Sequence, residues 1–137
     1  METEKLIQAA KDAMMRAYAP YSGFFVGAAL LTKSGKVYTG CNIENAAFGP
    51  SCCAERVAIF KAVSEGEKEF AAIAVCGGER GQIVGTFPPC GVCRQVMTEF
   101  CPPDFPVYLI KEGGYDAVTL EQLLPYAFSK KNMEESK

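Results

Sequence analysis

The chain has 137 residues, of which 49% are hydrophobic and 22% are charged. This length suits one domain with its own core, and the composition excludes an intrinsically disordered chain. The 14 Lys and Arg residues against 16 Asp and Glu residues give a net charge of −2. That balance argues against nucleic-acid polymers and anionic membranes as partners, because both require a basic surface.

The chain contains seven Cys and no His. The lack of His excludes every mechanism that needs an imidazole, including Ser-His-Asp and Cys-His catalysis. Residues 1–5 are acidic and lack the apolar stretch of a signal peptide. The longest nearly apolar stretch, residues 24–31, is far shorter than the ~18 residues of a membrane span. We therefore expect a soluble, cytoplasmic protein, in which a Cys cluster favours metal binding or catalysis over disulfides.

Hydrophobic periodicity and the positions of Gly and Pro divide the chain into predicted elements. In chain order these are a helix over 4–18, strands over 24–32 and 36–41, a helix over 53–64, a strand over 70–76, a helix over 90–100, strands over 106–111 and 115–118, and a last short helix over 119–124. The long segments 42–52 and 77–89 are predicted loops. We expect the second to be functional, because long loops inside compact domains often are.

A strand hairpin followed by alternating helices and strands predicts helices on both faces of a mixed sheet. The expected fold class is therefore α/β, a three-layer α/β/α sandwich around a mixed, mostly five-stranded sheet. The strand–helix–strand unit over residues 70–111 should form a right-handed crossover. We expect residues 1–137 to form a single domain that ends in a polar tail over about 129–137.

Three Cys residues at the starts of two predicted helices form a candidate metal site. Cys90 and Cys93 are three residues apart and therefore share one helix face, while Cys53 begins the other helix. These three thiolates can hold one Zn²⁺, and three protein ligands are typical of catalytic rather than structural zinc. Cys53-Ala54-Glu55 together with Pro89-Cys90-x-x-Cys93 also matches the zinc-deaminase signature in which Cys replaces His.

Glu55 is the candidate catalytic residue, because a carboxylate beside the metal can take a proton from water and return it to a substrate nitrogen. Zn²⁺ with three thiolates carries a charge of −1, which makes its water harder to deprotonate. The positive ends of both helices can offset this charge. An arginine that donates to the thiolates can do the same, and we favour Arg56 over Arg94 for that role.

Other uses of the cysteines remain open. A closed structural site would add a fourth thiolate from Cys41, Cys52, Cys76 or Cys101. Cys90 and Cys93 alone could instead form a redox pair. Adjacent Cys52 and Cys53 suit a single metal poorly, so we expect the four remaining thiols to be small apolar core side chains.

From Tyr18 to about Phe128 the sequence resembles cytidine deaminases of the small homotetrameric type with a three-cysteine zinc site. The motifs that carry the resemblance are Tyr18-Ala19-Pro20-Tyr21-Ser22, Phe24, Val26-Gly27-Ala28-Ala29-Leu30, Gly40-Cys41-Asn42-Ile43-Glu44-Asn45-Ala46, Cys53-Ala54-Glu55-Arg56, Pro89-Cys90-Gly91-x-Cys93-Arg94-Gln95 and Leu123-Leu124-Pro125. The resemblance implies a cytidine deaminase-like fold, one Zn²⁺ per subunit, and hydrolysis of cytidine and deoxycytidine to uridine and deoxyuridine plus ammonia in pyrimidine salvage.

The resemblance also implies roles for individual residues. Glu55 would protonate ring N3 and then the leaving amino group as water adds to C4 of the base. The implied substrate contacts are Phe24 stacked on the base, the Ala54 N–H on the base carbonyl, Asn42 and Glu44 on the ribose, and Phe128 from a neighbouring subunit. Phe48 stands where relatives often carry Tyr, so a hydroxyl at the subunit interface is missing.

Three competing functions remain. A deaminase of a modified cytosine nucleoside, such as blasticidin S, is disfavoured because Asn42 and Glu44 suit an unmodified ribose. A deaminase of bases within RNA or DNA needs a basic groove along the phosphates, and only local pairs such as Lys130-Lys131 supply such charge. A non-catalytic, zinc-stabilised module would leave Glu55 without a role.

Overall fold

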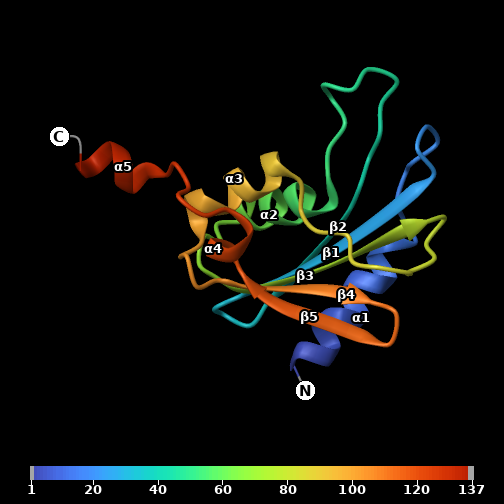
Figure 1. Cartoon of the computed structure of the whole chain (residues 1–137), viewed down its shortest axis with the longest axis horizontal. Coiled ribbons are helices and arrows are strands. Elements are labelled where there is room, and N and C mark those ends of the chain that lie inside the picture. The colour runs from blue at the N-terminus through green and yellow to red at the C-terminus, as the bar shows by residue number, and fades with distance from the viewer. Residues whose placement is uncertain (1, 136–137) are drawn as a thin grey trace.

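A five-stranded mixed sheet forms the centre of the fold in the computed structural model, which describes residues 2–135 (Figure 1). The strands are β1 (Phe24–Thr32), β2 (Val37–Cys41), β3 (Phe70–Glu79), β4 (Pro106–Lys111) and β5 (Gly114–Thr119), and the helices are α1 (Glu2–Met14), α2 (Ala54–Ser64), α3 (Gly91–Phe100), α4 (Leu120–Leu123) and α5 (Lys130–Glu135). The strand order is β2-β1-β3-β4-β5, with β3 and β4 parallel and the other neighbours antiparallel. The predicted mixed sheet is confirmed.

Helices cover both faces of this sheet. On one face α1 packs Leu6, Ala10 and Met14 against the sheet, because these residues recur along one side of the helix. On the other face α2 and α3 enclose a second core that includes Ile59 and Met97. Figure 1 shows α1 on one side of the strands and α2 with α3 on the other. The predicted three-layer arrangement is therefore confirmed.

Two glycines allow these helices to approach the sheet closely. A Cβ atom on Gly27 would lie 2.2 Å from the Ala10 carbonyl oxygen of α1, and one on Gly40 would lie 2.3 Å from the Ala54 carbonyl oxygen of α2. The first turn of α2 therefore rests directly on β2. This contact sets the position of Cys53, which is the N-cap residue of α2.

The first helix is shorter than its sequence pattern predicts. It ends at Met14 rather than at Tyr18, because the residues that follow pair with the chain beyond β2. The Tyr18 N–H donates to the Asn42 carbonyl at 3.0 Å, and the Tyr18 carbonyl accepts from the Glu44 N–H at 2.8 Å. The backbone thus exchanges helical hydrogen bonds for a bridge that anchors the 42–44 segment.

The third strand is longer than predicted and continues through Gly77 and Gly78 to Glu79. Gly77 pairs with Val26 of β1 and Gly78 pairs with Phe25. Glycine by itself disfavours a strand, so this pairing with β1 is what extends β3. The long segment that we predicted as a loop from residue 77 therefore leaves the sheet only after Glu79.

The C-terminal part contains two short helices. A capping box begins α4, with Thr119 Oγ1 accepting from the Gln122 N–H and Gln122 Oε1 accepting from the Thr119 N–H. Within the predicted polar tail, α5 forms a helix that projects away from the sheet (Figure 1). Residues 136–137 lie outside the described part. Among residues 2–135, no helix has the length and apolar character needed to cross a membrane.

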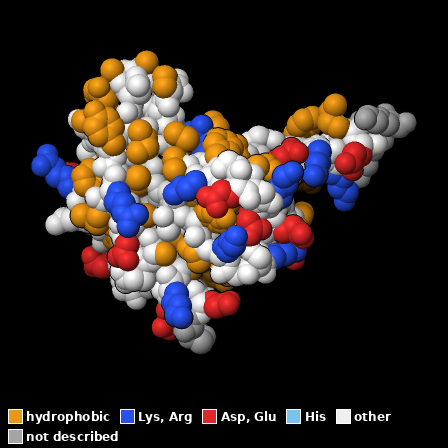
Figure 2. Space-filling model, turned by 180° about the vertical axis from the view of Figure 1, so that it is seen from behind, with side chains coloured by type: hydrophobic (Ala, Val, Ile, Leu, Met, Phe, Trp, Pro, Cys, Tyr) orange, Lys and Arg blue, Asp and Glu red, His pale blue; other side chains and the backbone are white. Residues whose placement is uncertain are grey.

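A second projecting segment, residues 42–52, connects β2 to α2 (Figure 1). Figure 2 shows hydrophobic side chains gathered on this projection. Phe48 at its tip is 89% exposed, and Ile43 and the nearby Tyr21 are also exposed. Such apolar exposure on a projecting loop is typical of a surface that another protein surface covers.

Candidate active site

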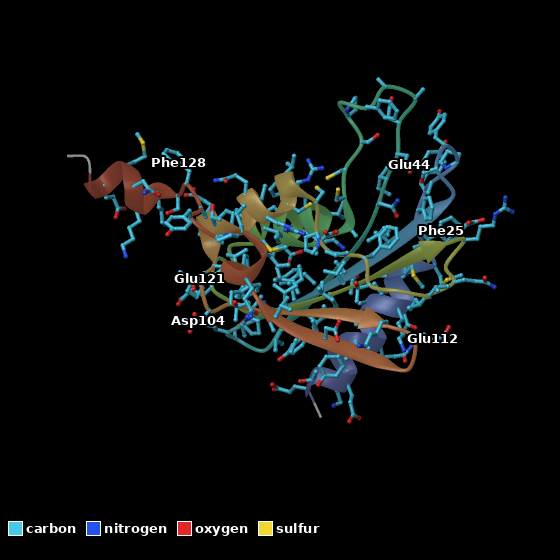
Figure 3. All side chains as sticks on the ribbon, in the orientation of Figure 1. Phe25, Glu44, Asp104, Glu112, Glu121 and Phe128 are labelled. Carbon is cyan, nitrogen blue, oxygen red and sulfur yellow. The ribbon has the colours of Figure 1, made fainter. Side chains whose placement is uncertain are left out.

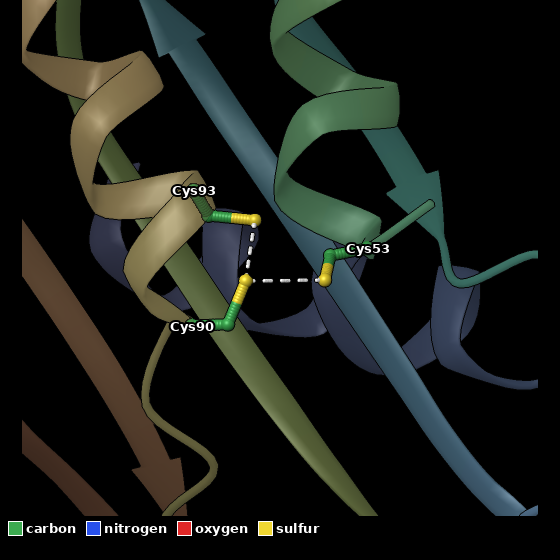
Figure 4. A group of neighbouring side chains, drawn as sticks. All are labelled: Cys53, Cys90 and Cys93. Atoms are coloured by element: carbon green, nitrogen blue, oxygen red, sulfur yellow. Dashed lines mark hydrogen bonds between the residues drawn. The ribbon is translucent and has the colours of Figure 1, made fainter. Parts of the chain in front are cut away.

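Three cysteine sulfurs meet where the first turns of α2 and α3 face each other (Figure 4). Cys53 Sγ lies 3.4 Å from Cys90 Sγ, which in turn lies 3.5 Å from Cys93 Sγ. All three sulfurs lie within 4.8 Å of one another. The structure thus brings together the three residues that the sequence pattern singled out from two distant segments.

This sulfur triangle fits a zinc ion. Tetrahedral Zn²⁺ with Zn–S bonds of about 2.3 Å places its sulfurs about 3.8 Å apart. Within residues 2–135, neither Cys41, Cys52, Cys76 nor Cys101 joins the group, which disfavours a closed four-cysteine site. The cluster therefore matches the three-ligand pattern of a catalytic zinc, and it binds one Zn²⁺ per chain.

Positive charge surrounds these sulfurs. Cys53 and Cys90 are the N-cap residues of α2 and α3, so the positive ends of two helix dipoles face the cluster. Arg56 Nη2 donates to Cys53 Sγ at 3.5 Å. Arg94 has a different role, because its Nε donates to the Pro89 carbonyl at 2.7 Å and its Nη1 to the Leu123 carbonyl at 2.6 Å. Arg56 is therefore the cation that offsets the excess thiolate charge.

Hydrogen bonds within the cluster favour the thiolate form of Cys53. A hydrogen bond from Cys93, with further ones from Arg56 and Cys90, lowers the pKa of the Cys53 thiol to about 5 against the opposing effect of burial. The hydrogen bond to Cys53, together with burial, raises the pKa of the Cys93 thiol. At neutral pH the cluster thus already holds the first thiolate that zinc binding requires.

Glu55 lies in the first turn of α2, two residues after Cys53, and only 3% of its surface is exposed. Burial raises the pKa of its carboxyl group to about 7. Its Oε1 atom is buried and has no hydrogen-bond partner within the protein. A buried, unpaired carboxyl oxygen is costly, so it marks a group that is completed by a ligand or solvent.

A pocket of about 410 Å³ opens beside the cluster. It is lined by Ser22, Phe24, Val26, Asn42, Ile43, Glu44, Phe48, Ser51, Cys52, Cys53, Glu55, Arg56, Phe87, Pro88 and Cys90. The predicted site residues Phe24, Asn42 and Glu44 thus share one cavity with the metal ligands Cys53 and Cys90. Ala54 at the start of α2 and Cys93 are fully buried and are not among the residues that line it.

Asn42 and Glu44 also organise the rim of this pocket. Asn42 Oδ1 accepts from the Val26 N–H at 2.8 Å and Nδ2 donates to the Phe24 carbonyl at 2.9 Å. Glu44 Oε1 accepts from the N–H groups of Tyr21 and Ser22. Hydrogen bonds from Ser22, chiefly its hydroxyl, lower the pKa of the Glu44 carboxyl. Each side chain therefore holds the backbone near Phe24 and keeps further hydrogen-bonding capacity.

Phe87 is a pocket residue that the sequence reasoning missed. Its ring centroid lies 5.8 Å from that of Phe24, and the two planes are tilted by 36°. The signal that could have found it was its place in the long segment before Cys90, which we expected to be functional. Ser22, Ser51 and Pro88 were missed as well, because small and turn residues are uninformative without tertiary contacts.

Phe128 does not reach the pocket of its own chain. Its carbonyl accepts from Gln95 Nε2 at 2.7 Å, and its side chain is exposed beside α3. Figure 3 shows Phe128 on the opposite side of the molecule from Glu44. Any contact of Phe128 with a substrate therefore requires a second subunit.

The chain matches the family model described as the cytidine and deoxycytidylate deaminase zinc-binding region over residues 1–109. It is 50% identical over 134 residues to a cytidine deaminase of Sporosarcina psychrophila, covering 97% of this chain and 96% of the relative. It is 48% identical over 136 residues to a cytidine deaminase of Halalkalibacterium halodurans, covering 98% and 100%.

A solved structure supports the same assignment. The crystal structure of cytidine deaminase from Burkholderia pseudomallei superimposes with a TM-score of 0.86 at 50% identity, covering 93% of this chain and 100% of that one. The fold and the three-sulfur cluster agree with these matches. The chain belongs to the cytidine and deoxycytidylate deaminase family and is a zinc-dependent hydrolase.

Proposed function

We propose that the chain, acting as a single catalytic domain, hydrolyses cytidine and deoxycytidine to uridine and deoxyuridine plus ammonia. The observation that carries this proposal is the unpaired, buried carboxyl of Glu55 beside a three-cysteine cluster at one end of a pocket. The cytidine deaminases of Sporosarcina psychrophila and Halalkalibacterium halodurans support cytidine as the substrate.

Cys53, Cys90 and Cys93 would hold the zinc ion, which when bound would lower the pKa of a water molecule and so provide the nucleophile for C4 of the base. Glu55 performs the proton transfers. As a carboxylate it accepts a proton from water, and as a carboxylic acid it donates that proton to ring N3. It then accepts the proton of the hydroxyl group added to C4 and donates it to the leaving amino group, so that ammonia departs and the C4 carbonyl forms. In the metal-free chain burial raises the pKa of the Glu55 carboxyl to about 7, so this site favours a group that can both accept and donate a proton near neutral pH.

The rest of the pocket orients the nucleoside. Phe24 offers an aromatic surface to the base, and the buried first turn of α2 presents the Ala54 N–H to the base carbonyl. Asn42 and Glu44, already hydrogen-bonded to the backbone around Phe24, use their remaining capacity on the ribose hydroxyls. Because the same two side chains bind the ribose and the backbone around Phe24, sugar binding is coupled to the position of Phe24.

The test measures the ultraviolet absorbance change as zinc-quantified protein meets cytidine. Glu55→Gln removes the proton carrier while keeping the shape, so turnover should fall by orders of magnitude with zinc content unchanged. Glu69→Gln, an exposed carboxylate remote from the pocket, is the matched control and should retain full activity. Absence of conversion by the fully zinc-loaded wild type would refute the proposed substrate.

We infer a homotetramer, on the strength of the family resemblance and of two exposed apolar segments. Tyr21, Ile43 and Phe48 gather at the projecting 42–52 segment. Tyr126, Phe128 and Met133 are exposed at the other end of the molecule, around α5. Contact between these surfaces of different copies would bring Phe128 to a neighbouring pocket, which its own chain does not do.

Subunit mixing tests this assembly directly. Phe128→Ala and Glu55→Gln proteins should each be impaired alone, while dissociation and reassociation of a mixture should restore part of the activity. The restored sites would combine Glu55 of one chain with Phe128 of another. A mixture no more active than the average of its components would contradict shared sites, and light scattering would report the number of subunits independently.

We also propose a cytoplasmic role in pyrimidine salvage. The net charge of −2 and the absence of a long apolar stretch support a freely dissolved enzyme. Expression of the chain in a pyrimidine-requiring, deaminase-deficient bacterium should permit growth on cytidine. Growth that depends on Glu55 would link the activity to salvage, and no growth despite active enzyme in the lysate would refute the role.

A further inference from the structure

A second cavity of about 540 Å³ lies beside the nucleoside pocket. It is lined by Phe24, Gly77, Gly78, Glu79, Arg80, Gln82, Val84, Gly85, Thr86 and Phe87. Phe24 and Phe87 line both cavities, so this aromatic pair forms the wall between them. None of the assigned catalytic, zinc-binding or ribose-binding residues lines the second cavity.

Phe87 is wedged into this wall. On one side its ring packs against Phe24, with the centroids 5.8 Å apart. On the other side it covers the backbone of Gly77 so closely that a Cβ atom there would lie 2.8 Å from the Phe87 ring. Cys90 follows three residues later and lines the same nucleoside pocket, so one chain segment supplies both a metal ligand and this wall.

The far side of the second cavity is fixed by its own backbone. Gly78 lies so close to the Gln82 carbonyl that any side chain at Gly78 would collide with it. The Arg80 N–H donates to the Gly23 carbonyl at 2.7 Å, which ties this turn to the residue before Phe24. These backbone contacts do not involve Phe87, so the Phe87 ring is the part of the wall that a substitution can remove.

We propose that Phe87 determines which cytosine nucleosides the site accepts, by closing the nucleoside pocket against the second cavity. The inference rests on the proposed deamination of cytidine. With Phe24 against the base, Phe87 limits the size of an apolar group attached to the base at C5. Removal of the ring would join the two cavities and give such a group space beside Val84 and Thr86.

The experiment compares kcat/KM for cytidine and for 5-propynylcytidine. The propynyl group at C5 is rigid and apolar, so it tests how much space the Phe24–Phe87 wall leaves. One misplaced methylene in an apolar pocket changes specificity by roughly 10- to 200-fold. We therefore expect Phe87→Ala to raise the propynyl-to-cytidine ratio at least about tenfold, and Phe87→Leu to raise it less. Gly77→Ala should lower the ratio, because its methyl group pushes the Phe87 ring toward Phe24.

Val84→Ala is the matched control, because Val84 lines only the second cavity and leaves the wall intact. The ratio of kcat/KM for 5-propynylcytidine to kcat/KM for cytidine in Val84→Ala should stay within about twofold of the wild-type ratio. If Phe87→Ala and Phe87→Leu lower activity on both substrates by the same factor, Phe87 has only a structural role and the inference fails. Failure of the zinc-loaded wild type to convert cytidine would instead refute the proposed function, and the inference with it.

Discussion

Gly40 of β2 and Ala54 of α2 are in contact so close that no side chain fits between them. A Cβ atom on Gly40 would lie 2.3 Å from the Ala54 carbonyl oxygen and 2.7 Å from the Ala58 nitrogen. Both are backbone atoms of α2, which has Cys53 as its N-cap residue and Glu55 in its first turn. The position of the catalytic turn therefore depends on a glycine in the neighbouring strand.

Gly40→Ala should displace the first turn of α2. We expect a loss of about 1–3 kcal/mol in the free energy of unfolding, as for other overpacked cores. Because Cys53 moves with the helix, zinc content and turnover should fall together. Gly114→Ala adds the same methyl group where nothing lies within 4 Å, so it should preserve both. Full zinc loading and activity in Gly40→Ala would show that the helix start adapts.

Arg56 should strengthen zinc binding through its contact with Cys53. Three thiolates and Zn²⁺ carry a charge of −1, which the Arg56 guanidinium neutralises. Arg56→Gln should weaken zinc affinity about 10- to 100-fold, as is typical for groups that support metal ligands. Competition with a chromophoric chelator measures this change. Lys68→Gln makes the same charge change on the exposed surface, so equal weakening there would contradict a local effect.

Glu44 should stabilise the fold in a pH-dependent way. Hydrogen bonds from Ser22 hold its pKa below the ordinary carboxyl value in the folded state. Its stabilising effect is therefore complete above the unfolded-state pKa of about 4.3 and is lost as the pH falls through the lower folded-state pKa. The difference in Tm between the wild type and Glu44→Gln should narrow from pH 7 to pH 3.5.

Zinc content must be followed at each pH, and Glu69→Gln serves as the reference. Glu69 is exposed, so the Tm of Glu69→Gln should differ little from that of the wild type at any pH from 7 to 3.5. A difference between the wild type and Glu44→Gln that stays constant from pH 7 to pH 3.5 would show that ionised Glu44 does not hold the Tyr21–Ser22 turn.

Removal of zinc should expose specific thiols to alkylation. In the loaded protein, coordination should protect Cys90 although it is exposed. After chelation, Cys53 should react first at neutral pH, because its pKa of about 5 makes it a thiolate. Cys76 and Cys101 should remain unmodified, since burial raises their pKa values to about 11 and about 12.

Iodoacetamide labelling followed by peptide mass mapping identifies each modified thiol. The chelated protein must retain its helical circular dichroism, so that Cys76 and Cys101 report burial rather than unfolding. Equal labelling of Cys90 before and after chelation would contradict its role as a zinc ligand.

Much of the fold could be predicted from local patterns. The apolar run from Phe24 to Thr32, the Thr119–Gln122 capping box and the amphipathic first helix each depend on neighbours within a few residues. Boundaries were less predictable where a distant segment supplied the hydrogen bonds. Tyr18 lies outside α1 because its backbone pairs with Asn42 and Glu44. Gly77 and Gly78 belong to β3 because they pair with β1.

The chemistry of the site could also be predicted from the sequence, because metal ligation demands particular atoms. Cys53, Cys90 and Cys93 at helix starts, with Glu55 beside them, predict a zinc-dependent proton-transfer site from residue types and spacing alone. Which arginine approaches the sulfurs depends on side-chain direction. Only the packed helices place Arg56 on Cys53 and direct Arg94 to the Pro89 carbonyl.

The sequence by itself therefore determined the residue types that hold zinc, the order of the elements and the family. The tertiary structure alone decided the shape of the pocket, because a cavity wall is made by side chains that are distant in sequence. The Phe24–Phe87 pair, the contact of Gly40 with Ala54 and the separation of Phe128 from its own pocket are all of this kind. Each is a long-range packing relationship, which no local sequence pattern encodes.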